Sequence, residues 1–284
     1  VLLQLSAAVA EEEESLVAMQ DCLARLDLGL ARARYGAWLG AVKPTLGGEC
    51  WQLKELRHPL LVWQERQEAG SAVVPVSLQI EPPLRVVAIT GPNTGGKTVT
   101  LKSLGLATLM ARSGLFLPCS GTPQLPWCEA VLADIGDEQS LQQNLSTFSG
   151  HVRRIARILE ALSRLGTAPV PALVLLDEVG AGTDPSEGAA LATALLRHLA
   201  DQVQLSVATT HFGELKALKY DDSRFENASV EFDEVSLRPT YRLLWGIPGR
   251  SNALAVARRL GLSEAVLGGA EQLMDEQGTS SVNT

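Results

Sequence analysis

The stretch Val86-Val87-Ala88-Ile89-Thr90-Gly91-Pro92-Asn93-Thr94-Gly95-Gly96-Lys97-Thr98 decides the fold class. Its first five residues form a continuous apolar, mostly β-branched run, which is typical of a strand buried on both faces of a parallel sheet. Residues 91–98 then fit the pattern Gly-x-x-x-x-Gly-Lys-Thr in full, and a helical pattern begins at Thr98. A strand, a glycine-rich loop and a helix in this order predict a phosphate-binding loop. A glycine-rich turn that binds nothing is the alternative, and this context disfavours it.

Each residue type in this loop has a physical role. The glycines let the backbone turn its N–H groups around a phosphate, and the helix that follows presents the positive end of its dipole there. Lys97 adds a charge for the β- and γ-phosphates, and Thr98 offers a hydroxyl to Mg²⁺. The expected nucleotide-binding residues are Gly91, Pro92, Asn93, Thr94, Gly95, Gly96, Lys97, Thr98 and Val99.

Further apolar runs of strand length alternate with helical patterns along the chain. The strand-like runs cover 130–135, 172–176 and 205–209, and the helical patterns cover 98–113, 151–165 and 187–200. This alternation predicts an α/β fold with a doubly wound, mostly parallel sheet. Residues 229–233 and 240–244 predict an antiparallel patch, and two further helices are expected near 252–259 and 263–274. The polar tail 275–284 is expected to fray.

The region before the loop has a different character. Residues 1–38 carry apolar side chains at spacings of three, four and seven, interrupted by four glutamates at 11–14, and predict a long amphipathic helix. Residues 43–48 break this pattern, and 50–83, including the apolar run 60–63, favour short strands and turns. The expected domains are a helical arm at 1–45, a main domain at 46–262 and a C-terminal helix with its tail at 263–284.

Composition limits the partners and the compartment. The chain has 284 residues, of which 46% are hydrophobic, enough for a sizeable core. No apolar run reaches the roughly eighteen residues of a membrane span, and the first residues lack a secretory pattern, so a cytoplasmic protein without a membrane partner is expected. A net charge of −8 does not favour nucleic-acid binding by the chain as a whole. The opening at Val1, inside a helical pattern, predicts a piece of a longer protein.

The four cysteines give no sign of a metal site. Cys22, Cys50, Cys119 and Cys128 form no Cys-x-x-Cys pair and have no histidine at ligand spacing. We expect them to be buried, reduced thiols.

A second polar cluster follows the run 172–176. Asp177 is suited to hold Mg²⁺ through water, and Glu178 to orient or deprotonate the attacking water. Such an acidic pair can also cap a helix. However, glycines come directly behind it, and the next helix has its own start signals, with Asp184 as the cap, Pro185 at the first position and Glu187 completing a capping box.

A third cluster follows the run 205–209. A lone histidine is more often structural, but His211 is expected at the same sheet edge as the other two clusters, where it can donate to a γ-phosphate. Lys97, Glu178 and His211 are therefore the expected catalytic residues, and Thr98 and Asp177 the expected metal ligands. Residues 134–151 have no function by spacing alone and favour a polar loop before a helix capped by Ser149.

Taken together, the motifs resemble the MutS ATPase family, a branch of the ABC-type P-loop NTPases. The segments that carry the likeness, in their order and spacing, are 91–98, Leu145-Ser146-Thr147-Phe148, 176–183 and Thr209-Thr210-His211-Phe212. Residues 182–190, 210–216 and 246–253 are similar to the bacterial type-two branch, whereas the mismatch-repair branch usually carries Ser-Thr in place of Asp184-Pro185. The similarity covers about 57–262.

Several roles follow from the resemblance alone. It implies ATP and Mg²⁺, and a homodimer in which Ser146 and Thr147 reach across the interface to the γ-phosphate bound by the other subunit. It implies that Asn93 contacts the phosphates, that residues 246–251 help complete the dimer, and that the N-terminal helix is the base of a lever arm. DNA contact, and the nuclease domain that this branch normally carries near its C-terminus, would lie outside this chain. Recombination intermediates, other branched DNA and ribosome-associated substrates all remain open.

Weaker features leave alternatives open. The basic residues of the 151–165 helix either contact DNA or, as we favour, a dimer or domain surface; they are Arg153, Arg154, Arg157 and Arg164. His58 lies near the nucleotide base by family analogy. A nucleotide-gated dimerisation module with negligible turnover is the second functional hypothesis. A transporter ATPase is disfavoured, because Leu145-Ser146-Thr147-Phe148 stands where such subunits carry Leu-Ser-Gly-Gly-Gln.

Overall fold

The computed structural model describes residues 1–68, 72–91, 96–136, 147–233, 238–247, 254, 257–258 and 261–280. The chain divides into two compact units. The first comprises Val1–Ile80 with Leu106–Trp127, and the second comprises Glu81–Gly105 with Cys128–Thr284. The helix α4 (Lys97–Arg112) contributes to both.

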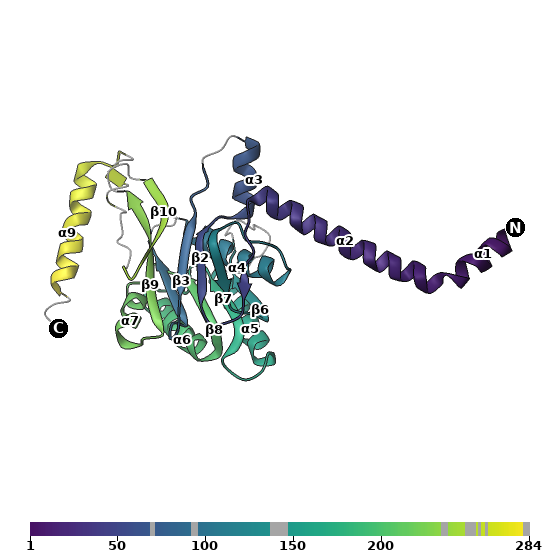
Figure 1. The fold of residues 1–284 in the computed structure, drawn as a ribbon. Helices are drawn as coiled ribbons and strands as arrows, with labels where there is room; N and C mark the ends of the chain where they lie inside the picture. The colour runs from purple at the N-terminus through teal and green to yellow at the C-terminus, as the bar shows by residue number, and fades with distance from the viewer. Residues whose placement is uncertain are drawn as a thin grey trace. The chain divides into compact units, whose positions relative to one another are not determined.

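The second unit is built on a six-stranded sheet (Figure 1). In order across the sheet, its strands are β10 (Arg238–Trp245), β9 (Phe225–Asp233), β4 (Val86–Thr90), β8 (Val203–Thr209), β7 (Val170–Leu176) and β6 (Ala130–Asp134). All neighbours are parallel except β10 and β9, which are antiparallel. The predicted mixed fold, with a mostly parallel sheet and an antiparallel patch, is confirmed.

A hydrophobic core joins this sheet to the helices α5 (Thr147–Arg164) and α6 (Pro185–Gln202). Ile158 and Leu162 of α5 and Leu196 and Leu199 of α6 belong to the same buried cluster as Leu176 at the end of β7. Burial of each such side chain contributes about 2 kcal/mol. The core therefore holds the two helices against the strands that carry the polar motifs.

The start of α6 agrees with its sequence signals. Asp184 is the N-cap, and its side chain accepts hydrogen bonds from the backbone N–H groups of Ser186 and Glu187, while Pro185 takes the first helical position. Between β8 and β9, the chain forms a short helical segment made of η2 (Glu214–Ala217) and α7 (Leu218–Asp221).

The C-terminal helix α9 (Glu264–Ser280) differs from expectation, because it continues through most of the tail that was predicted to fray. The helix predicted near 252–259 falls largely outside the described residues.

The first unit contains a four-stranded sheet. Its order is β1 (Thr45–Leu46), β5 (Ser120–Leu125), β2 (Trp51–Leu56) and β3 (Val76–Ile80). The prediction of a strand at the apolar run 60–63 is wrong. This run belongs to the helix α3 (Pro59–Glu68). Pro59 suits the first helical position, and Val62 donates its N–H to the carbonyl of His58. Only Val62 of this run is fully buried, as expected for a helix with one inward face.

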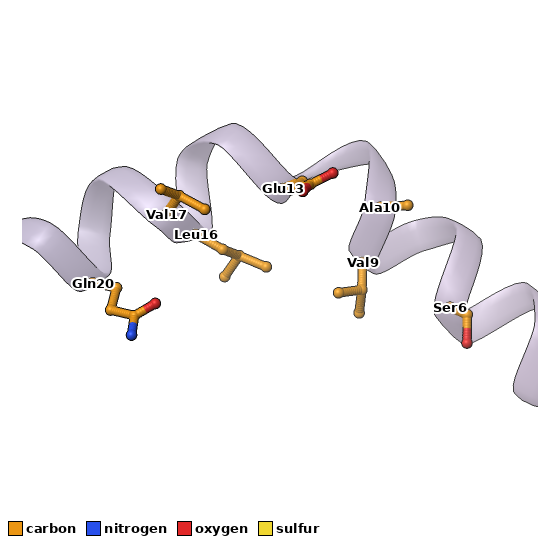
Figure 2. A pocket seen from close by; sticks show the side chains of 7 residues that line it. All are labelled: Ser6, Val9, Ala10, Glu13, Leu16, Val17 and Gln20. Carbon is orange, nitrogen blue, oxygen red and sulfur yellow. The ribbon is translucent and has the colours of Figure 1, made fainter.

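The predicted N-terminal helix is two helices, α1 (Leu2–Glu11) and α2 (Glu13–Leu39), drawn in purple in Figure 1. They meet at a bend at Glu12, whose N–H bonds to the carbonyls of Ala10 and Val9. No residue of α1 is buried, and α2 buries only Gly36 and Leu39. A shallow concave surface lies at the bend, where Val9 and Leu16 point to the same side (Figure 2). The apolar stripe of this arm is thus exposed.

The cysteines are only partly as expected. All four are free, but only Cys119 and Cys128 are buried, whereas Cys22 is exposed and Cys50 is half-buried. Burial raises the pKa of Cys119 to about 11, so this thiol is unreactive near neutral pH.

None of the described helices combines the length and the apolar character that a membrane crossing requires.

Candidate functional site

Three strands of the second unit place polar residues at one sheet edge. β4, β8 and β7 are adjacent and parallel, with Ile89 in register with Thr209 and Leu176 in register with Ala208. The carboxyl ends of parallel strands share an edge, so the residues that follow them meet there. The structure brings together Lys97, Thr98, Asp177, Glu178 and His211 at this edge.

Lys97 is buried, with 2% of its surface exposed. Its Nζ donates to the carbonyl of Gly91 over 2.7 Å and lies 3.1 Å from Nε2 of His211. Burial lowers the pKa of Lys97 to about 8, although the charges of Glu178 and Asp177 act in the opposite direction. A buried ammonium that is not fully compensated favours an anion beside it, as a phosphate site requires.

Both oxygens of the Asp177 carboxylate are held by hydroxyl groups. Thr98 donates its Oγ1 to Oδ2 over 2.7 Å, and Thr209 donates its Oγ1 to Oδ1 over 2.5 Å. Thr209 is fully buried and also accepts the N–H of Glu178 over 2.8 Å. The hydroxyl of Thr209 therefore fixes both acidic residues, a role that the sequence did not reveal.

The Thr98 hydroxyl and the Asp177 carboxylate fit a Mg²⁺ ion. They are hard oxygen donors 2.7 Å apart, and Mg²⁺ usually takes only one or two protein ligands together with water and phosphate oxygens. Within the described part of the chain, no group of three or more His, Cys, Asp or Glu side chains is placed to hold a metal.

Glu178 has an unusual backbone, with φ at +50°, in the left-handed region that glutamate rarely adopts. The conformation is held by its N–H bond to Thr209 and by the bond from the N–H of Val179 to the Thr209 carbonyl, 3.0 Å long. Strained residues held in this way cluster at active sites. The Glu178 carboxylate is partly exposed and lies 3.8 Å from Nε2 of His211.

His211 is half exposed and is placed to act as a neutral imidazole. Burial lowers its pKa, and the charge of Lys97 lowers it further, while Glu178 acts in the opposite direction. A neutral ring next to the Lys97 ammonium can take part in hydrogen bonds without adding a second positive charge.

Part of the predicted site lies outside the described residues, namely Pro92, Asn93, Thr94, Gly95 and Ser146, together with the side chain of Thr147. Of the other predicted loop residues, Gly96 accepts both the N–H and the hydroxyl of Thr100, and Val99 is in the first turn of α4.

The loop after Glu178 packs tightly at Gly180. Its φ is +82°, and a Cβ there would lie 2.5 Å from the carbonyl oxygen of Gly188 and 2.8 Å from the Phe212 ring. The site loop thus contacts both α6 and the residue after His211 without room for a side chain.

Gly180→Ala is expected to lower the free energy of unfolding by about 3 kcal/mol or more, because left-handed strain adds to a backbone clash. Gly246→Ala is the matched control, since Gly246 has φ at +73° but no atom of the described residues lies within 4 Å of its Cβ position. Denaturant unfolding of both variants measures the difference. Equal losses would show that the close approach at Gly180 has no energetic weight.

Another polar cluster lies beside this edge, in the stretch 134–151, for which residue spacing alone predicts no function. Asp134, at the end of β6, is 2% exposed, and its carboxylate contacts Nδ1 of His151 at 2.7 Å and accepts a hydrogen bond from Nε of Arg154. The sequence signal that could have indicated this cluster is Asp134 itself, an acidic residue at the end of β6, which lies beside the strand that precedes Asp177. The expected helix start is also corrected: α5 begins at Thr147, so Ser149 lies inside its first turn and is not its cap.

The chain is similar to known proteins over most of its length. Residues 87–277 match the family described as MutS domain V. The chain is 61% identical to an Endonuclease MutS2 of Synechocystis sp. over 98% of its own length and 35% of that protein. It is 50% identical to an Endonuclease MutS2 of Shouchella clausii, over 97% of this chain and 33% of that protein. The chain thus spans about a third of the length of the curated relatives it matches.

Proposed function

Because the chain belongs to the MutS family, in its type-two branch, we propose that it hydrolyses ATP with Mg²⁺ at the edge formed by β4, β7 and β8. The observation that carries the proposal is the Asp177 carboxylate, held by the Thr98 and Thr209 hydroxyls. Lys97 and Glu178, which a phosphoryl transfer to water also requires, lie at the same edge.

Each of these side chains has a task in the reaction. Thr98 and Asp177 would hold Mg²⁺, which, when bound, neutralises charge on the phosphate oxygens. The Lys97 ammonium binds the β- and γ-phosphates, and the Glu178 carboxylate orients the attacking water and accepts its proton. Neutral His211 donates a hydrogen bond to the γ-phosphate. The left-handed backbone of Glu178 supports this role, since it fixes the carboxylate beside His211.

The proposal includes a homodimer with composite sites. In it, Ser146 and Thr147 of one subunit contact the γ-phosphate bound by the loop of the other. Its support is the likeness of these residues to the family motif and the start of α5 at Thr147.

Nucleotide state would then pass through a helical arm, residues 1–45, to DNA bound by parts outside this chain. We propose that the ATPase domain covers 46–262 and that the C-terminal helix with its polar tail, 263–284, is a linker to a further domain. Branched or recombination DNA is the proposed substrate class. Because the relatives are named Endonuclease MutS2, we also propose a nuclease activity for the longer protein, in parts outside this chain. The alternatives are nucleotide-gated dimerisation with negligible turnover and a ribosome-associated role.

Mixing two inactive variants tests the composite site. Lys97→Ala removes the loop charge, Ser146→Ala removes the trans hydroxyl, and each alone should be nearly inactive with Mg²⁺ and ATP. A 1:1 mixture is expected to recover about a quarter of wild-type turnover, because half of the dimers are mixed and each mixed dimer has one complete site. A mixture as inactive as its components contradicts the trans arrangement, and a wild-type protein without Mg²⁺-dependent turnover contradicts the proposed hydrolysis.

A further inference from the structure

The buried carboxylate of Asp134 has no task in the proposed reaction. A buried charge is strongly destabilising unless it is paired and hydrogen-bonded. Among the described residues, the partners of this carboxylate lie on α5: Oδ2 lies 2.7 Å from Nδ1 of His151, and Oδ1 accepts a hydrogen bond from Nε of Arg154. Positions 151 and 154 are three residues apart and so lie on one face of the helix. The pairing fastens the first two turns of α5 to the end of β6.

Asp134 is also hydrogen-bonded to the residue that follows β7. The backbone carbonyl of Asp134 accepts the N–H of Asp177 over 2.8 Å. The hydrogen bond to Asp134 raises the pKa of His151, and the Glu178 charge acts in the same direction. A protonated His151 strengthens its bond to Asp134. Buried Asp134 therefore links the helix to the strand that precedes the acidic pair.

A second contact brings α5 against the loop after Glu178. A Cβ at Gly182, where φ is +88°, would lie 3.2 Å from the backbone nitrogen of Phe148 and 3.3 Å from its Cβ. Phe148 is the second residue of α5. The start of the helix is thus held on two sides, by Asp134 and by the loop that follows the catalytic glutamate.

We propose that Asp134, His151 and Arg154 form a polar clamp that positions the start of α5 for ATP hydrolysis. This inference rests on the proposed function. The three are positioning residues, because they act through the helix and not on the nucleotide. Loss of the clamp changes the rate of the reaction and the ATP-driven association of two subunits, whereas the nucleotide loop of the same subunit keeps its affinity.

The test compares two substitutions of one residue in the intact protein. His151→Ala removes the bond to Asp134, whereas His151→Asn keeps an N–H donor at the position of Nδ1. Alanine is also the better helix former, so a loss in His151→Ala is not a matter of helix propensity. Glu160→Ala is the control, because it breaks the exposed pair with Arg164 at the other end of α5. The readouts are kcat and KM for Mg²⁺-ATP, the Kd of a fluorescent ADP, and self-association with ATP by sedimentation velocity.

His151→Ala is expected to lower kcat by about 10- to 100-fold, as a misplaced reacting group does, with KM and the ADP Kd changed by less than about twofold. His151→Asn should recover most of kcat and of the association, and Glu160→Ala should match the wild type. The clamp is refuted if His151→Ala keeps wild-type turnover and association, if it loses ADP affinity in parallel, or if His151→Asn recovers nothing. If the wild type self-associates in the presence of ATP but does not turn it over, only the proposed hydrolysis is overturned. The clamp is then tested by comparing the self-association of the variants with that of the wild type. A wild type that does neither overturns both.

Discussion

Glu178→Gln is expected to lower ATP turnover by about a hundred- to ten-thousandfold, the range attributed to a general base, while nucleotide binding is retained. The amide has the same size and keeps the backbone bonds to Thr209, so the left-handed conformation at this residue is preserved. It cannot accept a proton from water. The substitution therefore separates the chemical step from binding.

Phosphate release gives kcat for this variant, and a fluorescent ADP gives its Kd. Glu187→Gln is the matched control, because Glu187 is an exposed glutamate at the start of α6. Turnover equal to the wild type would remove Glu178 from the mechanism. Mass in solution with ATP, with ADP and without nucleotide separates the two functional hypotheses: an ATP-dependent dimer in a wild type that does not turn over ATP favours the dimerisation module.

Lys97→Met is expected to weaken ATP binding by about 10- to 100-fold, since each ionic hydrogen bond to a phosphate contributes about 1.5–3 kcal/mol. Methionine keeps much of the buried volume and removes the charge. Because burial lowers the pKa of Lys97 to about 8, the ammonium is less stable in the nucleotide-free protein than in water. The variant should therefore unfold at an unchanged or higher denaturant concentration even though it binds ATP poorly.

Calorimetric titration with ATP and urea unfolding without nucleotide measure these opposite effects. Lys102→Met is the control, because Lys102 is exposed on the same helix. Unchanged affinity in Lys97→Met would count against the whole assignment of the phosphate site. If Lys97→Met lost both ATP affinity and stability to urea, the main role of Lys97 would be packing in the core and not phosphate binding.

The sequence predicted those parts of the fold that are determined by residues close together in the chain. The bounds of β4 follow from its unbroken apolar run, and Asp184 and Pro185 gave the start of α6. The run 60–63 misled, because four apolar residues alone do not distinguish a strand from one inward-facing helix turn. The strand β5 contains Gly121 and Pro123, which disfavour strands, and it forms through its pairing with β1 and β2.

In the site, too, features set by nearby residues could be predicted, whereas features set by long-range pairing could not. Asp177 and Glu178 follow an apolar run directly, and Lys97 and His211 lie a short distance beyond theirs, so the parallel order of the strands brings them to one edge. The role of Thr209 could not be predicted, because it depends on the register that sets its hydroxyl against Asp177, 32 residues earlier in the chain. The pairing of Asp134 with His151 needs both the position of β6 beside β7 and the true start of α5.

The left-handed backbone at Glu178 has an evolutionary consequence. A glycine at this position would relieve strain of about 1 kcal/mol or more, but it would remove the carboxylate. Selection for thermal stability and selection for turnover therefore favour different residues at one codon. On the proposed function, a substitution that relieves the strain at Glu178 also lowers turnover, so stability without loss of turnover is expected from substitutions at other positions.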